Sequence, residues 1–172
     1  MYISDIIKAD TQMEKIYGTT IRQDGLMKVG RKRWELFYGF GKDNDDDETG
    51  YNYRQVFAYK PTLEEIKAII IGQINKITDE KILCGLVWND IPIWLSSENQ
   101  FNYKAAYDLA IQTNGESLPV TFKFGTDSEP VYHTFDTLSE FQEFYVTSLA
   151  YVQDVLADGW NEKDNIDWNI FL

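Results

Sequence analysis

The sequence predicts an α+β fold in which antiparallel β-hairpins alternate with amphipathic helices, with the helices on one face of the sheet. Two observations support this class. Pairs of short segments rich in aromatic and β-branched residues, each joined by turn residues, occur three times along the chain. A longer segment with apolar residues at three- and four-residue spacing follows each pair. Three hairpin–helix units are therefore expected, related by pattern and not by residue identity.

The first unit begins with the segments 34–40 and 51–59, whose aromatic and β-branched residues indicate a long hairpin. Thr62 and Glu65 then have the spacing of a capping box, in which each side chain accepts a hydrogen bond from the other residue's backbone N–H. The helix that they begin is expected to end near residues 78–79. Its apolar face is predicted at Ile66, Ile69, Ile70, Gln73, Ile74 and Ile77.

The second and third hairpins are shorter. Segments 83–88 and 91–95 flank Asn89-Asp90, a dipeptide typical of a two-residue hairpin turn. Segments 118–124 and 131–135 alternate apolar and polar residues at the period of a strand. Each pair is expected to form an antiparallel hairpin.

The helix of the second unit is predicted over 98–113. Ser96 or Ser97 is expected to cap its first turn, and Asn114-Gly115 is typical of a helix end. Its inward side chains are predicted to be Phe101, Ala105, Leu109 and Ala110.

The longest predicted helix, 137–158, belongs to the third unit. Thr137 has the position of its N-cap, and Gly159 is expected to end it. Its apolar stripe is predicted at Leu138, Phe141, Tyr145, Leu149, Val152 and Leu156. We expect this stripe to be buried against the strands of the third hairpin.

The two ends of the chain carry apolar residues with few local partners. Residues 1–17 indicate a short helix or arm, and residues 161–172 form a tail. Each end is expected either to dock on the chain itself or to bind a partner, and we expect at least one to cross to another subunit. The candidate partner-binding residues are Ile3, Ile6, Ile7, Trp168, Ile170, Phe171 and Leu172. The chain then divides into 1–60, an arm and hairpin suited to attachment, and 61–172, the α+β domain with its tail.

The charge of the chain excludes some partners. Its 172 residues carry a formal charge of −12, so we expect neither nucleic acid nor an anionic membrane as a partner. Residues 1–42 hold eight Lys/Arg against five Asp/Glu, a net charge of +3, which leaves −15 for the rest. Regions of opposite charge can attract each other or a neighbouring subunit.

Cys84 is the only cysteine, so the chain forms no internal disulfide. It lies in an apolar run and is expected to be a small core residue. Neither a signal-peptide pattern nor an apolar run of membrane-spanning length is present, so synthesis and folding in a reducing cytosol are expected.

No pattern in the sequence predicts catalysis, a metal site or a cofactor. The acidic run 43–48 fails the calcium-loop spacing, because Glu48 falls on the sixth position and Arg54 on the twelfth. We interpret it as a solvated loop, with a weak cation site as the alternative. His133 is the only histidine, and a structural role for it is favoured over a triad or a zinc site.

Basic and aromatic residues allow more than one interpretation. The run 31–33 beside Trp34 suits a nucleic-acid patch or, as we favour here, a local salt-bridging edge. The 5 Trp, 11 Tyr and 10 Phe suit a carbohydrate platform or a protein interface. The interface is favoured, because a sugar site also needs polar neighbours that the sequence does not identify.

Three segments carry a resemblance to a known family. They are 85–89 (Gly-Leu-Val-Trp-Asn), 94–102 (Trp-Leu-Ser-Ser-Glu-Asn-Gln-Phe-Asn) and 132–135 (Tyr-His-Thr-Phe), followed by the long helix that ends in Gly159-Trp160. This part of the chain resembles uncharacterised proteins of tailed phages and prophages of gut Bacteroidales, with tail-fibre-associated ββα-type domains. The resemblance implies a setting in a virion or its assembly, and no catalytic residue.

We therefore expect a non-enzymatic bacteriophage protein that is attached to, or built into, the virion tail or fibre assembly. Its partners would be other phage structural proteins of the tail, fibre or portal-proximal region, in an oligomer made in the host cytoplasm and located in the virion. One alternative is a fibre-assembly chaperone that is absent from the mature particle. A glycan-acting enzyme is the least favoured alternative.

Overall fold

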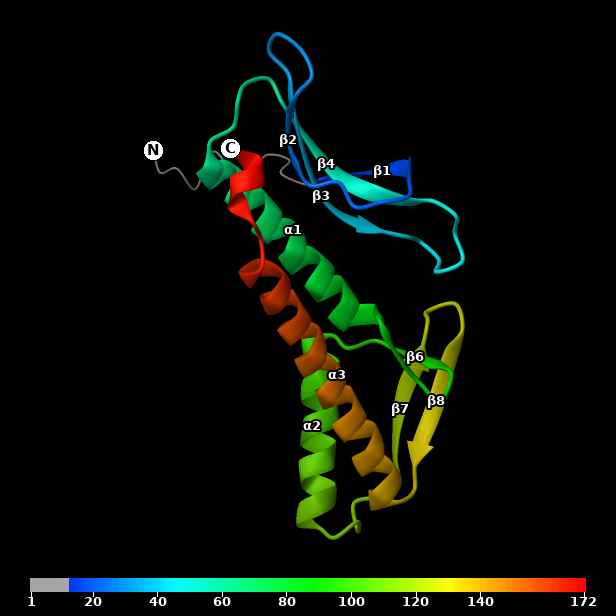
Figure 1. Ribbon diagram of the computed structural model, residues 1–172. Coiled ribbons are helices and arrows are strands. Elements are labelled where there is room, and N and C mark those ends of the chain that lie inside the picture. Colours follow the sequence, from blue (N-terminus) through cyan, green and yellow to red (C-terminus); the bar gives the residue numbers. More distant parts are fainter. Residues whose placement is uncertain (1–12) are drawn as a thin grey trace. The chain divides into compact units, whose positions relative to one another are not determined.

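The structure is a computed structural model that describes residues 13–172, and it has the α+β fold that the sequence predicts (Figure 1). Each of the three predicted hairpins, β3–β4, β5–β6 and β7–β8, is followed by a helix. The strands belong to three separate antiparallel sheets. In chain order, the elements are β1 (Glu14–Thr19), β2 (Gly25–Lys28), β3 (Trp34–Gly41), β4 (Gly50–Phe57), α1 (Leu63–Cys84), β5 (Leu86–Trp88), β6 (Ile91–Ile93), α2 (Ser97–Gln112), β7 (Val120–Gly125), β8 (Pro130–Phe135), α3 (Leu138–Asp164) and the 3₁₀ helix η2 (Trp168–Phe171).

The chain forms two compact units, each with its own core. The described part of the first, the sheet unit, comprises 13–74 and 163–172, and the second, the hairpin unit, comprises 75–162. The chain passes from one unit to the other inside α1 and again inside α3. The sequence had suggested a division between residues 60 and 61, before α1 begins.

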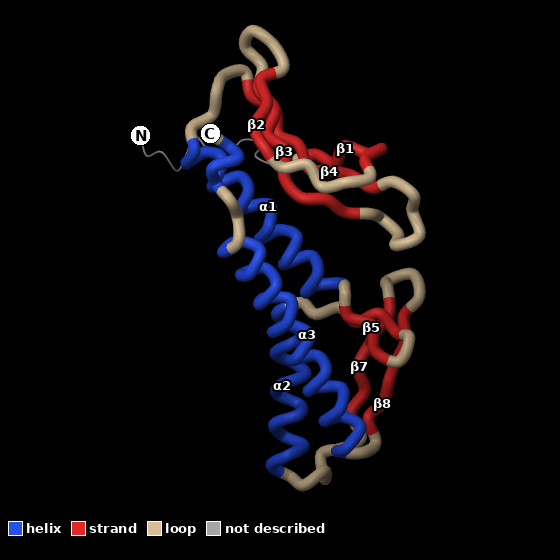
Figure 2. The backbone as a smooth tube through the Cα atoms, in the orientation of Figure 1, coloured by secondary structure: helices blue, strands red, loops and turns tan. Residues whose placement is uncertain are grey.

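The sheet unit contains one four-stranded sheet in the order β1-β4-β3-β2 (Figure 2). The predicted long hairpin is its centre, with Trp34 opposite Phe57 and Tyr38 opposite Tyr53. The side chains of one sheet face pack with those of the first half of α1 and of the tail. This core consists of Met13, Leu36, Tyr38, Phe57, Ile66, Ile69, Ile70, Ile74 and Phe171.

Asn52, a fully buried polar residue, organises the turn that precedes β2. Its Oδ1 accepts a hydrogen bond from the backbone N–H of Gln23 at 2.7 Å. Its Nδ2 donates to Thr19 Oγ1 at 2.7 Å and to the Ile21 carbonyl at 3.0 Å. The burial of this amide is therefore compensated by hydrogen bonds that fix the conformation of the segment 19–23.

The N-terminal prediction is wrong where it can be compared with the structure. Residues 14–17 form part of strand β1, not a helix, and pair with β4, so that Ile16 lies opposite Asn52. Backbone pairing with β4 and the Arg54–Glu14 ion pair at 2.6 Å outweigh the loose helical spacing of the apolar residues. The predicted partner-binding residues Ile3, Ile6 and Ile7 lie outside the described residues.

The C-terminal tail docks on its own chain. Phe171 is 2% exposed in the core of the sheet unit, and its ring centroid lies 6.5 Å from that of Tyr38. Trp168 packs against the same core, whereas Ile170 and Leu172 remain exposed. Phe171 is thus a core residue, which corrects its assignment as a partner-binding residue.

Helix α1 confirms the predicted capping box and most of the predicted face. Thr62 donates its backbone N–H to Glu65 Oε2 at 2.7 Å, and the N–H of Glu65 donates to Thr62 Oγ1 at 3.3 Å. The helix continues to Cys84, beyond the predicted end, and Ile82 in its last turn packs against the core of the hairpin unit. Cys84 is exposed, not in the core as predicted, and its thiol donates to the Glu80 carbonyl at 3.1 Å.

The hairpin unit has a core built mainly from aromatic rings. Trp88 lies at its centre, with its ring centroid 5.2 Å from that of Phe144 and 5.7 Å from that of Phe135. The turn before β6 has the predicted form, with Asn89 and Asp90 both at positive φ (48° and 62°). The buried residues are Leu86, Trp88, Ile93, Leu95, Tyr103, Ala110, Phe124, Phe135, Phe141 and Phe144.

Helix α2 has the predicted ends but a different buried face. Ser96 caps it, accepting from the backbone N–H of Asn99 at 3.2 Å, and Gly115 closes it with a hydrogen bond to the Ala110 carbonyl at 2.8 Å. The inward residues are Tyr103, Ala106, Tyr107 and Ala110. Of the predicted inward set only Ala110 is buried, because the larger Tyr103 and Tyr107 occupy the core side and turn Phe101, Ala105 and Leu109 outward.

Helix α3 has the predicted cap but not the predicted end. Thr137 Oγ1 accepts from the N–H of Glu140 at 3.3 Å, and Phe141 is fully buried as expected. Gly159 does not end the helix, which continues to Asp164. A Cβ at Gly159 would lie 2.5 Å from Thr78 Oγ1, so the glycine allows α1 and α3 to approach closely. The buried positions are Phe141, Phe144, Ser148, Val155 and Gly159.

Candidate functional site

The first candidate site is an apolar groove along the contact between α2 and α3, which we call the seam groove. It has a volume of about 220 Å³. Leu149, expected in the core, is 46% exposed beside it, and Tyr145 and Val152 are only partly buried. The groove is lined by Leu95, Gln100, Phe101, Tyr103, Lys104, Tyr145, Ser148, Leu149 and Val152.

Two tyrosines that line the seam groove pack against other aromatic rings. The ring of Tyr103 packs edge-on against Phe144 with centroids 5.1 Å apart, and Tyr107 stacks on Tyr145 at 4.5 Å. Phe101, on the outer side of α2, is 70% exposed. The groove therefore combines tyrosines held by ring packing with large apolar side chains that remain in water.

Few charges border the seam groove, but the unit around it is acidic. Lys104 pairs with Asp108 at 2.5 Å, a hydrogen bond that raises the pKa of the lysine. The Gln100 amide donates to the Leu95 carbonyl at 2.8 Å and so holds one end of the groove. Residues 75–162 carry four Lys/Arg against 14 Asp/Glu, a formal charge of −10.

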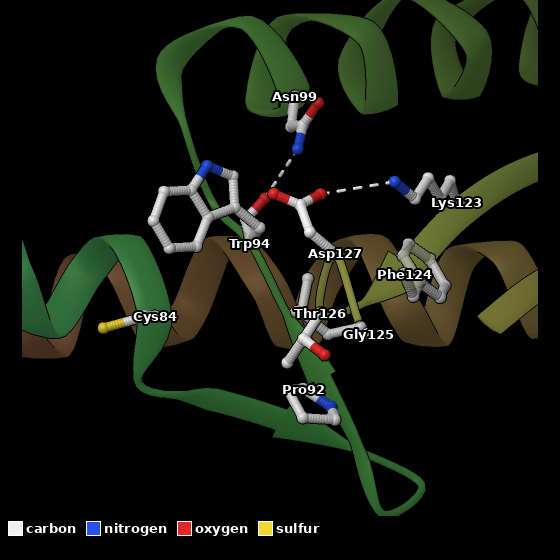
Figure 3. A pocket seen from close by; sticks show the side chains of 10 residues that line it. Cys84, Pro92, Trp94, Asn99, Lys123, Phe124, Gly125, Thr126 and Asp127 are labelled. Atoms are coloured by element: carbon white, nitrogen blue, oxygen red, sulfur yellow. Dashed lines mark hydrogen bonds and ion pairs between the residues drawn. The ribbon is translucent and has the colours of Figure 1, made fainter. Parts of the chain in front are cut away.

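The second candidate site is a cavity of about 480 Å³ in the hairpin unit, which we call the Trp94 pocket (Figure 3). One wall comes from the end of α1 and from β6 with the start of α2, and the other from the β7–β8 hairpin. The residues that line it are Cys84, Pro92, Ile93, Trp94, Asn99, Lys123, Phe124, Gly125, Thr126 and Asp127.

Trp94 is turned toward solvent because its neighbours on both sides are buried. Ile93 and Leu95 are each 1% exposed, and successive side chains of an extended segment point to opposite sides. Trp94 is accordingly 50% exposed. Asn99 Nδ2 donates to the Trp94 carbonyl at 2.8 Å, and Ser96 caps the same turn, so the backbone that carries the indole is fixed.

The opposite wall of the Trp94 pocket is a tight turn. Gly125 has φ +79°, and a Cβ there would lie 2.4 Å from the Glu129 carbonyl oxygen, so only glycine fits. The backbone N–H of Thr126 donates to that carbonyl at 3.2 Å, which closes the turn. Asp127, at its tip, pairs with Lys123 at 3.4 Å.

His133 packs beside the aromatic core of the hairpin unit, as its structural interpretation predicts. Its ring lies edge-on to Trp88 with centroids 5.0 Å apart and lies 4.6 Å from Phe135. Its Nε2 is 3.0 Å from Glu140 Oε1, which ties β8 to the first turn of α3. The histidine therefore sits among the core rings as part of the packing.

No family model, no curated protein and no solved structure matches the chain. Among residues 13–172, no group of three or more His, Cys, Asp or Glu side chains is arranged to hold a metal ion. Within the same part of the chain, no helix is long and apolar enough to cross a membrane.

The charged segments singled out in the sequence make local contacts. Asp43 pairs with Lys15 at 3.0 Å, and the hydrogen bond from this lysine lowers the pKa of the carboxyl group. Asp47 Oδ2 accepts from the backbone N–H of Asn44 at 3.0 Å within the acidic loop. Arg33 pairs with Glu35 at 2.6 Å, as expected for a salt-bridging edge.

The sequence did not identify either candidate site as a unit. Trp94, Lys123 and Asp127 come together through the packing of two hairpins that are distant along the chain. The seam groove depends on which face of each helix is buried, and both α2 and α3 carry apolar residues on more than one face. The alternation of apolar residues around Trp94 was the one local signal that could have marked it as exposed.

Proposed function

We propose that this protein is a non-enzymatic interaction protein that binds an amphipathic helix of a partner in the seam groove. The observation that carries the proposal is Phe101, a phenylalanine 70% exposed beside a preformed apolar groove. Large aromatic side chains on a rigid surface are typical of the residues that contribute most to protein binding. Leu149, on the other helix of the groove, adds a second exposed apolar side chain.

A helix is the occupant that this groove fits best. Two packed helices leave a shallow apolar channel along their contact, and an amphipathic helix can place its apolar side chains in such a channel. The charge of −10 on residues 75–162 favours a partner with lysines and arginines beside its apolar face. The proposed partner is therefore a basic amphipathic helix.

The sequence resemblance adds a setting to this proposal. A tail or fibre assembly of a tailed phage would supply structural proteins as partners, and the protein would be part of the virion. A fibre-assembly chaperone is the alternative. Mass spectrometry of purified particles distinguishes the two, because a virion component is present in intact particles and a chaperone is found only in the infected cell.

Binding can be tested with a synthetic peptide of leucine and lysine that forms an amphipathic helix of five turns, about 18 residues. We expect saturable binding to the full chain at physiological salt, measured by fluorescence anisotropy. Phe101→Gln should weaken binding about tenfold or more, since losing a major aromatic contact costs about 1.4 kcal/mol or more. Tyr132→Gln is the matched control, because Tyr132 is also 70% exposed but lies on β8, outside the groove.

Equal binding by the Phe101→Gln and Tyr132→Gln variants would overturn the assignment of the groove. Equal binding of a leucine–glutamate peptide of the same length would overturn the basic character of the partner. Self-association of the chain that Phe101→Gln abolishes would assign the groove to a second copy, which contradicts the proposed occupant. Analytical ultracentrifugation of both variants tests this last outcome.

A further inference from the structure

We propose that the Trp94 pocket binds a neutral saccharide, with the indole of Trp94 as the surface on which a sugar ring stacks. This inference goes beyond the protein-binding role of the seam groove and rests on different residues. Its elements are a half-exposed tryptophan, a cavity of about 480 Å³ and a set of polar side chains around the same space (Figure 3). The volume lies in the range of small-molecule sites, about 300 to 1,000 Å³.

Trp94 has the features of a stacking surface. The face of an indole carries the negative part of its quadrupole, and the C–H groups on one side of a pyranose ring are weakly positive, so the two faces attract. The backbone of Trp94 is held by Asn99 and by the buried side chains of Ile93 and Leu95. Because the backbone that carries the indole is already ordered, binding loses little backbone entropy there.

The polar side chains match the hydroxyl groups of a sugar. Each sugar hydroxyl can both donate and accept a hydrogen bond, so its site needs both kinds of partner. Asn99 can accept through Oδ1 and can donate the amide hydrogen that does not bond to the Trp94 carbonyl, Lys123 donates, and Asp127 accepts. Thr126 Oγ1 is already engaged by the Glu129 N–H and by Ser128 Oγ within the turn. These are the polar neighbours of an exposed tryptophan that could not be identified from the sequence alone.

The charge of the pocket favours a neutral ligand. Lys123 and Asp127 are the two charged residues that line it, and they pair at 3.4 Å. A phosphate or a carboxylate would meet one cation, Lys123, which is already paired with Asp127. A cationic ligand would meet one anion, Asp127, which is already paired with Lys123. Both side chains are solvent-exposed, and a neutral polyhydroxyl ligand can hydrogen-bond to either without displacing its partner.

Cys84 provides a reporter inside the site. It is the only cysteine of the chain, it is exposed, and it lines the pocket beside Trp94. A ligand in the pocket should restrict access to the thiol and slow its alkylation. The rate of Cys84 modification by iodoacetamide, followed by mass spectrometry, therefore measures occupancy directly in the full-length protein.

The experiment uses cellobiose, maltose, lactose and N,N′-diacetylchitobiose as probes at millimolar concentrations. We expect at least one of them to slow alkylation of Cys84 several-fold in a saturable manner. Trp94→Ala should remove this protection, and Asp127→Ala should weaken it. Trp160→Ala is the matched control, because Trp160 is 57% exposed in the same unit but lies outside the pocket. Circular dichroism establishes that each variant is folded.

Three results would overturn the proposal. They are unchanged alkylation with all of the disaccharides, protection that persists in a folded Trp94→Ala variant, and loss of protection in Trp160→Ala to the same extent as in Trp94→Ala. Peptide binding in the seam groove is expected to be the same in wild type and Trp94→Ala. Failure of the saccharide proposal is therefore separable from failure of the protein-binding proposal.

Discussion

At the scale of single residues, the two glycines inside helices act in opposite ways. Glycine in a helix interior costs about 0.5–1 kcal/mol relative to alanine. A Cβ at Gly72 would meet no atom within 4 Å, so packing at that position does not require glycine. A Cβ at Gly159 would lie 2.5 Å from Thr78 Oγ1 and 3.3 Å from its Cγ2. Close packing therefore requires glycine at 159 but not at 72.

Gly159→Ala is expected to lower the free energy of unfolding by about 1 kcal/mol, because a steric cost of about 1–3 kcal/mol exceeds the gain in helix propensity. Gly72→Ala should raise it by about 0.5–1 kcal/mol. In a Thr78→Ala background, where the nearest remaining atom is Cβ at 3.5 Å, adding Gly159→Ala should become stabilising. Urea denaturation of wild type, the three single variants and the double variant measures these values. An unchanged effect of Gly159→Ala in the Thr78→Ala background contradicts the contact.

Tyr103 gives the stability of the hairpin unit a dependence on alkaline pH. Burial raises the pKa of its phenol from 10.0 to about 12. Since the unfolded chain releases this proton at lower pH than the folded chain, the neutral phenol stabilises the fold below pH 10 and that contribution is lost as pH rises through about 12. Tyr103→Phe should therefore stay folded to higher pH in a circular-dichroism titration. An unfolding midpoint identical to that of wild type would contradict this.

At the scale of elements, the ends of helices and hairpins were predictable because their signals are local. The Thr62–Glu65 box, the Asn89-Asp90 turn and the Ser96 cap each depend on residues within a few positions of one another. The role of Gly159 inside α3 was not predictable in the same way. The need for glycine there comes from Thr78, which lies 81 positions earlier in the sequence (159 minus 78).

The buried faces of α2 and α3 were less predictable than their ends. Apolar residues occur around most of each helix, so periodicity alone allows more than one inward face. The packing of rings decides between them, as Tyr103 and Phe144 meet in the core while Phe101 and Leu149 are left outside. The seam groove and the Trp94 pocket depend on which side chains this tertiary packing buries. No local sequence pattern predicts that outcome.

The corrected face of α3 can be tested with a pair of alanine substitutions. Phe141 is fully buried among the rings of Phe122, Phe135 and Tyr107, so Phe141→Ala should lower the free energy of unfolding by about 3–5 kcal/mol. Leu149 is 46% exposed, so Leu149→Ala should change it by about 0.5 kcal/mol or less. Thermal or urea denaturation provides both values. A large loss for Leu149→Ala would place that side chain in the core and remove the seam groove.

At the scale of the whole molecule, the chain builds two cores that share no residue. One contains Leu36 and Phe171, and the other contains Trp88 and Phe144. Each core depends on segments that are distant in sequence, since Phe171 joins strands that precede it by more than 100 positions. The tail therefore contributes to the stability of the sheet unit and is not simply a free arm. Of the two predicted arms, the C-terminal one lies among the described residues, and it packs on its own chain.

Phe171→Ala tests whether the two cores unfold as separate units. Removing a ring that is 2% exposed should cost about 3–5 kcal/mol. Because that ring packs only in the core of the sheet unit, amide protection from hydrogen exchange should fall for Leu36 and Tyr38 in β3. Protection of Phe122 and Phe124 in β7, part of the other unit, should fall much less. If protection falls equally in β3 and β7, the two cores unfold together, with α1 and α3 transmitting the loss along their length.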